Sequence, residues 1–311
     1  MKSQKILIAL LLAATVLTIG CKKDGVYRPS EKISAFSFYY ERDHQRYNTE
    51  KKIWESIQKD STRRYTTEKW VWNDKQLNRI DLYDQGSNAS YCQLGFVYDG
   101  NRLTRVNISN TKHYVTYEYD GRRITRMTVH SQNGDIWSDY SFGYDGKKIS
   151  TVTITGNYLT AKSEATRALA LMPVLGDIQA AQSIESLYQK TTGSKSDQTV
   201  FEITWKGNNI KSIKNRDSGA TEVTYTHDNK TNPLRGLLTS ALTGINELSH
   251  TSAYGNENNI TSADYGTEKQ SYSYTYSDDL PTSRSRSIVD HYTQGYRYVK
   301  TYITYYEYIE D

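Results

Sequence analysis

The sequence predicts a mainly β fold: an antiparallel up-and-down meander of hairpins that curls into a barrel or a strongly curved sheet, with short helical insertions. Three observations lead to this prediction. A strand–turn–strand motif recurs through much of the chain, and its turns carry Asp-Gly or a similar pair that favours chain reversal. Tyrosine, whose ring packs on pleated surfaces while its hydroxyl reaches water, occurs 28 times against 5 phenylalanines. Successive hairpins most simply pair with their neighbours in order.

The clearest copy of the motif spans residues 117–129 and reads YEYDGRRITRMTV. Two apolar or aromatic residues two positions apart define one face of the first strand, and Asp-Gly supplies positive φ where the chain reverses. The next Ile or Leu packs back against the aromatic pair. Further copies begin near residues 70, 96, 142 and 203, and a degraded copy begins near 225. The residues assigned to structural turns are Asp99, Gly100, Asp120, Gly121, Asp145, Gly146 and Gly207.

The register of each hairpin is left open by the sequence. A two-residue turn would place Glu118 across from Arg123, whereas a four-residue loop would pair Tyr119 with Ile124. The return strand breaks a strict period of two, so we expect a β-bulge just after the turn. Because the motif predicts so many strands, the sheet is expected to curl strongly or to close.

Two stretches interrupt the strand pattern. Residues 161–190 are rich in Ala and Leu at helical spacing, and Pro173 divides them, so two short helices are expected there. A further short helix is predicted at 233–243, where Asn232-Pro233 supplies a cap and a first helical residue.

The N-terminus predicts export. Two lysines precede an apolar run that ends in Gly20-Cys21, so residues 1–20 are expected to form a signal peptide. The junction resembles the lipobox of bacterial lipoproteins, in which the cysteine is acylated and becomes the new N-terminus, although Thr18 stands where that motif usually has an aliphatic residue. The resemblance implies lipidation at Cys21 and a membrane partner through the lipid. The alternative is an ordinary signal peptide with an incidental cysteine.

Residues 21–33 are interpreted as a tether, and residues 34–311 as a single β domain. Cys92 is the only cysteine besides Cys21, so no internal disulfide is expected, and a small buried hydrophobic role is its simplest interpretation. The net charge of +4 falls to +2 without the two lysines of the signal peptide. Because charges of both signs are interspersed along the chain, we predict no nucleic-acid partner.

The sequence contains no recognisable motif for catalysis, a metal or a cofactor. Its 6 histidines form no zinc-protease spacing and no Cys/His cluster, and it has neither a Gly-rich phosphate loop nor a nucleophile elbow. Asp278-Asp279 and the repeat aspartates lie at predicted turns, where Asp usually bonds the local backbone. We therefore predict no catalytic residue, no metal, no cofactor and no enzymatic activity. The alternative to this prediction is a hydrolase whose site is of an unrecognised type.

The aromatic side chains carry the one binding hypothesis. Trp70, Trp72, Trp137, Tyr272 and Tyr274 could present rings on which sugars stack inside a curled sheet, which suits capture of a glycan or a peptide. The alternative is that these rings build a thin β core and its cross-strand pairs.

The repeats resemble two known groups. Tyr-Asp-Gly followed by a basic residue and Ile or Leu is similar to the tyrosine-aspartate hairpins of RHS-type repeat proteins. The same repeats, together with HDNKTNPL at 227–234 and NNI at 258–260, resemble a Bacteroidota lipoprotein family of unknown function with a porin-like, all-β fold. The resemblance covers roughly residues 34–311 and brings no catalytic residue with it, since none is defined for that family.

The resemblance implies a protein lipid-anchored in the outer membrane, either periplasmic or surface-exposed. Arg105, Arg126, Arg297 and Lys300 lie within predicted strands, where a lipid-facing band would be apolar, so an anchored barrel is favoured over a spanning one. The favoured function is a non-catalytic cell-envelope lipoprotein that binds a glycan or a peptide, or serves as a scaffold. The alternative is an accessory subunit of an outer-membrane assembly, with an envelope protein as its partner.

Overall fold

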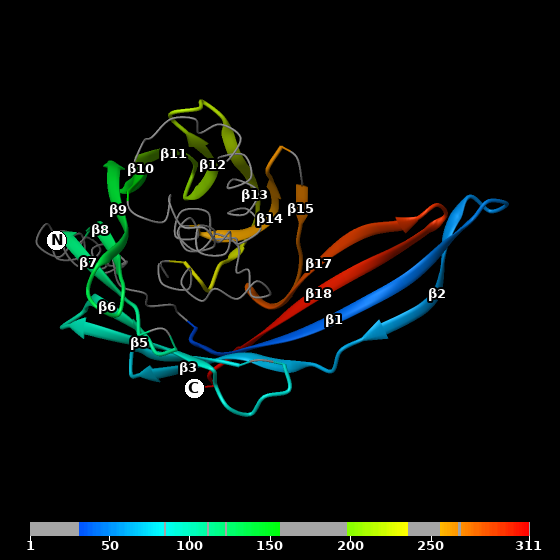
Figure 1. The fold of residues 1–311 in the computed structure, drawn as a ribbon, viewed down its shortest axis with the longest axis horizontal. Helices are drawn as coiled ribbons and strands as arrows, with labels where there is room; N and C mark the ends of the chain where they lie inside the picture. Colours follow the sequence, from blue (N-terminus) through cyan, green and yellow to red (C-terminus); the bar gives the residue numbers. More distant parts are fainter. Residues whose placement is uncertain are drawn as a thin grey trace, which may run out of the picture.

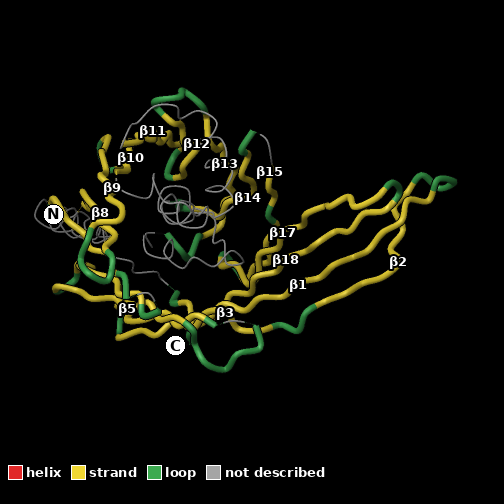
Figure 2. Tube along the Cα trace, in the orientation of Figure 1, coloured by secondary structure: helices red, strands yellow, loops and turns green. Residues whose placement is uncertain are grey.

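The computed structural model describes residues 31–83, 85–110, 112–121, 123–155, 198–235, 256–266 and 269–310. The predicted signal peptide (1–20), Cys21, most of the tether (21–33) and the predicted helical insertion (161–190) lie outside these residues, as do residues 236–243 of the second predicted helix. The described residues form strands and loops, and Figure 2 shows no helix among them. Accordingly, this part of the chain has no helix suited to crossing a membrane.

Eighteen strands form one antiparallel sheet. Their bounds are β1 (Ile33–Asn48), β2 (Ile53–Ser61), β3 (Tyr65–Asn73), β4 (Gln76–Leu82), β5 (Cys92–Asp99), β6 (Arg102–Ile108), β7 (Tyr114–Asp120), β8 (Arg123–His130), β9 (Ile136–Asp145), β10 (Lys148–Thr155), β11 (Gln198–Lys206), β12 (Asn209–Asn215), β13 (Thr221–Thr231), β14 (Asn258–Asp264), β15 (Lys269–Ser271), β16 (Ser273–Ser277), β17 (Leu280–Thr293) and β18 (Tyr296–Tyr308).

The strands follow one another around a ring, as Figure 1 shows. From β3 to β15, each strand pairs with the next one in the chain. Only Tyr272 separates β15, which pairs with β14, from β16, which pairs with β17. The ring is completed by the pairs β17–β18, β18–β1 and β1–β3. The prediction of a mainly β, antiparallel up-and-down meander that curls into a barrel is therefore confirmed.

Four strands extend beyond the ring as a projecting sheet, which we call the arm (Figure 1). The arm comprises residues 41–48 of β1, all of β2, residues 286–293 of β17 and residues 296–302 of β18. β1 reaches both parts of the molecule because it is 16 residues long. Its residues 35–38 pair with β3 in the ring, its residues 41–48 pair with β2 in the arm, and β18 follows it through both. The strand order across the arm is thus β2, β1, β18, β17.

The hairpin register resolves the alternative that the sequence leaves open. Tyr119 pairs with Ile124, and Glu118 pairs with Arg126, so Thr125 is an extra residue in the return strand. The same shift follows the turns of five other hairpins. The predicted β-bulge just after the turn is therefore confirmed, together with the Tyr119–Ile124 pairing.

In the repeated motif, the aromatic residue before the turn donates a hydrogen bond to a backbone carbonyl of an earlier strand, and Tyr274 and Tyr308, which do not directly precede a turn, do the same. The Tyr119 hydroxyl, for example, donates to the carbonyl of Leu103 at 2.6 Å. Leu103 directly precedes the bulge of its own hairpin, where the regular ladder of hydrogen bonds is interrupted. We call this series of bonds the aromatic–carbonyl ladder. Its donor and acceptor pairs are Trp72–Ile33, Tyr98–Leu77, Tyr119–Leu103, Tyr144–Ile124, Trp205–Ile149, Tyr274–Ile260 and Tyr308–Pro281, at 2.6 to 3.0 Å.

The basic residue of the motif covers the ladder ring of the next hairpin. The Arg102 guanidinium lies 5.8 Å from the centroid of the Tyr119 ring, and the Arg123 guanidinium lies 5.2 Å from that of Tyr144. Lys148 lies over Trp205 in the same way, at 5.7 Å. Each contact joins neighbouring copies, so the aromatic, the turn and the basic residue of the motif form one packing unit.

The apolar core lies on one face of the sheet, as alternation along a strand requires. On β5, Cys92, Leu94 and Phe96 are buried, whereas Gln93 and Val97 are exposed. The ladder rings belong to the buried face, where they pack against the core cluster. The motif therefore builds the wall of the barrel.

Candidate functional site

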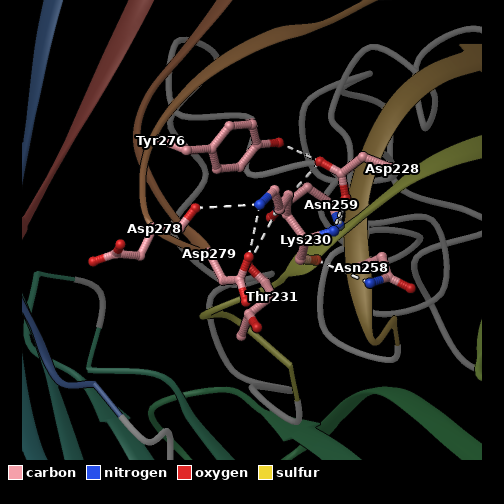
Figure 3. Close-up of polar contacts among 8 residues, drawn as sticks. All are labelled: Asp228, Lys230, Thr231, Asn258, Asn259, Tyr276, Asp278 and Asp279. Carbon is pink, nitrogen blue, oxygen red and sulfur yellow. Dashed lines mark hydrogen bonds and ion pairs between the residues drawn. The ribbon is translucent and has the colours of Figure 1, made fainter.

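A cluster of polar side chains gathers where β13 ends, β14 begins and β16 turns into β17 (Figure 3). The turn at Asp278-Asp279, in which Asp278 has a φ of 54°, lies against the end of β13. There the Thr231 amide donates to the Asp279 carbonyl at 3.1 Å. We call the group the Asp228 cluster. Its members are Asp228, Lys230, Thr231, Asn258, Asn259, Tyr276, Asp278 and Asp279.

The Asp228 carboxylate is the centre of this cluster. One oxygen accepts the backbone amides of Lys230 and Asn259 at 3.0 and 3.1 Å. The other accepts the Tyr276 hydroxyl, as Figure 3 shows, and the Asn259 side-chain amide at 3.4 Å. Burial and the hydrogen bond to Asp228 raise the pKa of Tyr276. Tyr276 is therefore a protonated donor at neutral pH, which makes it unsuited to act as a base.

The Lys230 ammonium bridges β13 to the β16–β17 turn. Its Nζ lies 2.7 Å from Asp279 Oδ1 and 3.3 Å from the Asp278 carbonyl oxygen. The hydrogen bond and the charge of Asp279 raise the pKa of Lys230. The ion pair is exposed, so its own contribution to stability is small and salt-dependent.

Buried asparagines complete the backbone hydrogen bonds around the cluster. Asn259 donates to the Thr231 carbonyl at 3.2 Å, and Asn232 donates to the Asn256 carbonyl at 3.0 Å. The Asn256 side-chain oxygen accepts the Ile210 amide at 2.6 Å. These three asparagines are at most 4% exposed. They supply partners to backbone groups that irregular strand ends would otherwise bury unpaired.

The Asp228 cluster is best suited to a structural role. Asp228 is engaged by backbone, amide and phenol donors, and Lys230 is engaged by an aspartate and a carbonyl. Among the residues that the structure describes, no group of three or more His, Cys, Asp or Glu could hold a metal ion. The cluster fixes three chain segments together and presents no activated acid, base or nucleophile.

A second polar and aromatic group lies on the arm. We call the face of the arm that continues the buried face of β1 its inner face. It carries Tyr40, Arg42, His44, Asp60, Arg286, Asp290, Tyr298, Lys300 and Tyr302, which pair directly across neighbouring strands.

Arginines and lysine alternate with the tyrosine rings on the inner face. The Arg42 guanidinium lies 5.6 Å from the centroid of Tyr40 and 5.2 Å from that of Tyr298. Arg286 lies 5.4 Å from the centroid of Tyr302, and Lys300 lies 4.9 Å from that of Tyr298. Such cation–π contacts stabilise cross-strand pairs in a sheet that has no second layer against it.

The opposite face of the arm carries a different group near its tip. Tyr47 and Trp54 are in ring contact at 5.2 Å between centroids, and the Arg297 guanidinium lies 4.3 Å from the centroid of Trp54. Val289 is 46% exposed nearby in the sheet. We call these four residues the tip patch. Tyr, Trp and Arg are the residue types that dominate binding energy in protein interfaces.

Glu222 on β13 is a buried carboxyl outside both groups. Its side chain is 5% exposed. Burial raises the pKa of Glu222 to about 7, and a hydrogen bond with Asn215 opposes part of that rise. This carboxyl titrates near neutral pH, and its pKa is set by burial and by the hydrogen bond with Asn215.

The residues predicted to bind ligand lie in the barrel wall. Trp70 is 4% exposed and donates to Glu68 at 2.7 Å, and Tyr272 is 5% exposed and donates to Gln270 at 2.6 Å. Trp72 and Tyr274 are donors of the aromatic–carbonyl ladder. Trp137 belongs to β9, and its side chain lies outside the described residues. The structure brings none of these described rings to an open surface, and their ligand-binding role stays a prediction.

The residues predicted at turns are found at hairpin ends. Gly100, Gly121, Gly146 and Gly207 have φ of 58° or 59°, and each follows directly on a strand. Asp99, Asp120 and Asp145 are the last residues of β5, β7 and β9. Cys92 is a buried free cysteine.

The sequence reasoning missed the two groups described above. Residues 227–234 and 258–260 contributed to a family resemblance, but nothing in them indicated that Asp228 meets Tyr276. The alternation of Tyr40, Arg42 and His44 on one strand was a signal for the inner face of the arm.

Comparisons with known proteins add little. No protein-family model matches this chain, and no curated protein matches it. Among solved structures, the chain is similar to a porin-like protein from Bacteroides uniformis ATCC 8492, with 11% identity and a TM-score of 0.49. The match covers 93% of this chain and 100% of that chain. Because the TM-score is below 0.5, we base no functional inference on this likeness.

Proposed function

We propose that the chain is a non-catalytic binding module of the cell envelope, anchored in the outer membrane by a lipid on Cys21 and binding its ligand through the arm. The observation that carries the proposal is the arm itself, a single layer of four strands with half-exposed side chains on both faces. Sheets usually bury at least one face, because an uncovered layer gains little from apolar burial. A layer so exposed is well placed to contact a ligand.

Charged side chains on the outward face of the barrel support an anchored protein over a membrane-spanning one. Arg79 and Asp81 form an ion pair at 2.8 Å, and Arg126 and Asp139 form one at 2.6 Å. Arg105 is exposed beside the buried Val106. Lipid-facing positions of a spanning barrel are apolar, because charges in the hydrocarbon region are costly.

The lipid anchor is tested by replacing the acylated residue. In a bacterium that processes lipoproteins, the wild-type chain should incorporate labelled fatty acid and sediment with membranes. Cys21→Ser should lose the label and leave the membrane fraction, whereas Cys92→Ser should keep both properties. Label retained by Cys21→Ser would refute lipidation at Cys21.

The binding role is tested with the processed full-length protein in detergent, against arrays of glycans and of peptides. Saturable binding to one class, lost when inner-face side chains are replaced, is the expected result. Absence of binding to both arrays would overturn the proposal.

The tip patch favours a second candidate function, that of an accessory subunit of an outer-membrane assembly. Tyr47→Ala and Arg297→Ala should then abolish co-purification of a membrane partner after gentle detergent extraction, while glycan binding is unchanged. A monodisperse monomer under those conditions would count against this role.

A further inference from the structure

We propose that the inner face of the arm binds an anionic glycan, with Arg42 as the anchor for a sugar carboxylate. This inference rests on the proposed binding function and names the class of ligand. It begins from the way the Arg42 side chain is held. Its Nε donates to the Tyr40 hydroxyl at 2.8 Å, and the rings of Tyr40 and Tyr298 lie within 5.6 Å of the guanidinium carbon. The guanidinium is therefore positioned before any ligand arrives.

The remaining donors of Arg42 are open to a ligand. Among the residues that the structure describes, no carboxylate lies within ion-pair distance of Arg42. Asp60 lies directly across from Arg42 on β2, but its carboxylate is held by His44 at 3.0 Å and Gln58 at 2.8 Å. An arginine held through its Nε can offer its two terminal nitrogens as a pair of parallel hydrogen bonds to a carboxylate.

The neighbouring groups also favour a polar anion. The Tyr40 hydroxyl accepts from Arg42, so its own hydrogen remains available for donation. Burial raises the pKa of Tyr302, so that hydroxyl stays protonated. Lys300 is paired with Asp290 at 2.7 Å and Arg286 donates to Gln270 at 2.9 Å, whereas the Nε of Arg42 is held by a neutral tyrosine hydroxyl.

The sheet geometry favours a glycan over a peptide. β1 is paired with β2 and β18, and β18 is paired with β1 and β17, so a strand could be added to the arm only at the outer edges of β2 and β17. A peptide that binds as an added strand would lie along one of those edges and not over Arg42, which belongs to the central strand β1. Recognition over Arg42 must use side chains, and here these are tyrosine hydroxyls and rings, cationic groups, and the carboxylates of Asp60 and Asp290, which are paired with His44 and Lys300. A polyuronate supplies hydroxyls and repeating carboxylates to match them.

The test compares ligands that differ in one property each. Processed full-length protein is titrated with oligogalacturonate, with the methyl-esterified form of the same chain, with a neutral glucan, and with poly-L-glutamate. Binding to oligogalacturonate alone, weakening as NaCl is added, is the expected result. Arg42→Gln should weaken it roughly tenfold or more, since hydrogen bonds to charged groups are lost.

Matched variants separate charge, geometry and folding. Arg42→Lys keeps the charge without the two-pronged donor and should bind between wild type and Arg42→Gln. Arg216→Gln, which removes an exposed arginine paired with Glu202 outside the arm, should bind as wild type, and thermal melting of each variant shows that it is folded.

Three outcomes overturn the inference. They are equal binding of the methyl ester, equal binding of poly-L-glutamate, and wild-type affinity in a folded Arg42→Gln variant. If neutral glucan binds while oligogalacturonate does not, this inference fails and the binding function stands. If no ligand in either array binds, both fail.

Discussion

Tyr119 donates its hydroxyl hydrogen to the backbone carbonyl of Leu103 at 2.6 Å and so joins the third copy of the hairpin motif to the second. The accepting carbonyl belongs to the residue just before a bulge, where the strand ladder leaves backbone groups unpaired. Phenylalanine could fill the same space without supplying this donor. The abundance of tyrosine over phenylalanine in this chain thus has a structural cause at the ladder positions.

Tyr119→Phe should lower the free energy of unfolding by about 1 kcal/mol, because the hydrogen bond is lost while the ring is retained. Urea titration followed by tryptophan fluorescence measures the change. Tyr47→Phe is the control: its side chain is 37% exposed, so removal of its hydroxyl should have little effect. Equal effects of the two substitutions would show that the ladder bond contributes nothing specific.

Gly121→Val should destabilise the protein by roughly 1–2 kcal/mol, because a β-branched side chain is strained at positive φ. Gly121 has a φ of 59°, and a Cβ there would meet no atom within 4 Å. Gly95 in β5 has equally open space without a positive φ. Gly95→Val should therefore be neutral, since valine suits a strand. If Gly121→Val has the same melting temperature as the wild type, Gly121 does not occupy the positive-φ position of the turn.

Glu222→Gln should change how stability depends on pH. The folded-state pKa of Glu222 is about 7 against an ordinary value of 4.5, so the folded chain binds the extra proton between these pH values. The contribution of Glu222 to the free energy of unfolding is fully present below about pH 4.5, and it is lost as the pH rises through about 7. The variant should match wild type at low pH and melt at a higher temperature above pH 7. If the melting temperatures of the variant and the wild type differ by the same amount at every pH from 4 to 8, the prediction is wrong.

Asp228→Asn and Tyr276→Phe should be strongly coupled. A double-mutant cycle is expected to give an interaction energy of about 1 to 3 kcal/mol, because the hydrogen bond joins a hydroxyl to a charged carboxylate. Asp228→Asn combined with the distant Tyr119→Phe is the control, and those effects should add. Additivity within the first pair would mean that Asp228 acts through its backbone partners alone.

The strands and their bulges could be predicted from the sequence, because each hairpin is a local unit. The choice between the Tyr119–Ile124 and Glu118–Arg123 pairings could not, since the same Asp-Gly turn serves both loop lengths. The ladder was missed because its donors and acceptors lie in different hairpins or strands, 14 to 56 residues apart along the chain.

The candidate sites also depend on contacts between residues far apart in the sequence. Tyr276 and Asp228 are 48 residues apart, and nothing local to either indicates the other. The inner face of the arm requires β1 and β18, the first and last strands, to pair. The aromatic residues could be recognised as structural or ligand-binding from composition, but only the pairing of strands shows which rings are buried in the wall and which lie on the arm.

The pairing of β1 with β18 has a consequence for the order of folding. The Ser37 hydroxyl donates to Glu307 across 270 residues of chain. β1, the longest strand of the sheet, therefore cannot complete its pairing until β18, the last strand, has been synthesised. Contacts this distant in sequence slow folding, and an unpaired strand edge invites aggregation meanwhile. A chain that ends at residue 295 should retain its hairpins yet fail to close, and it should aggregate far more readily than the full-length chain.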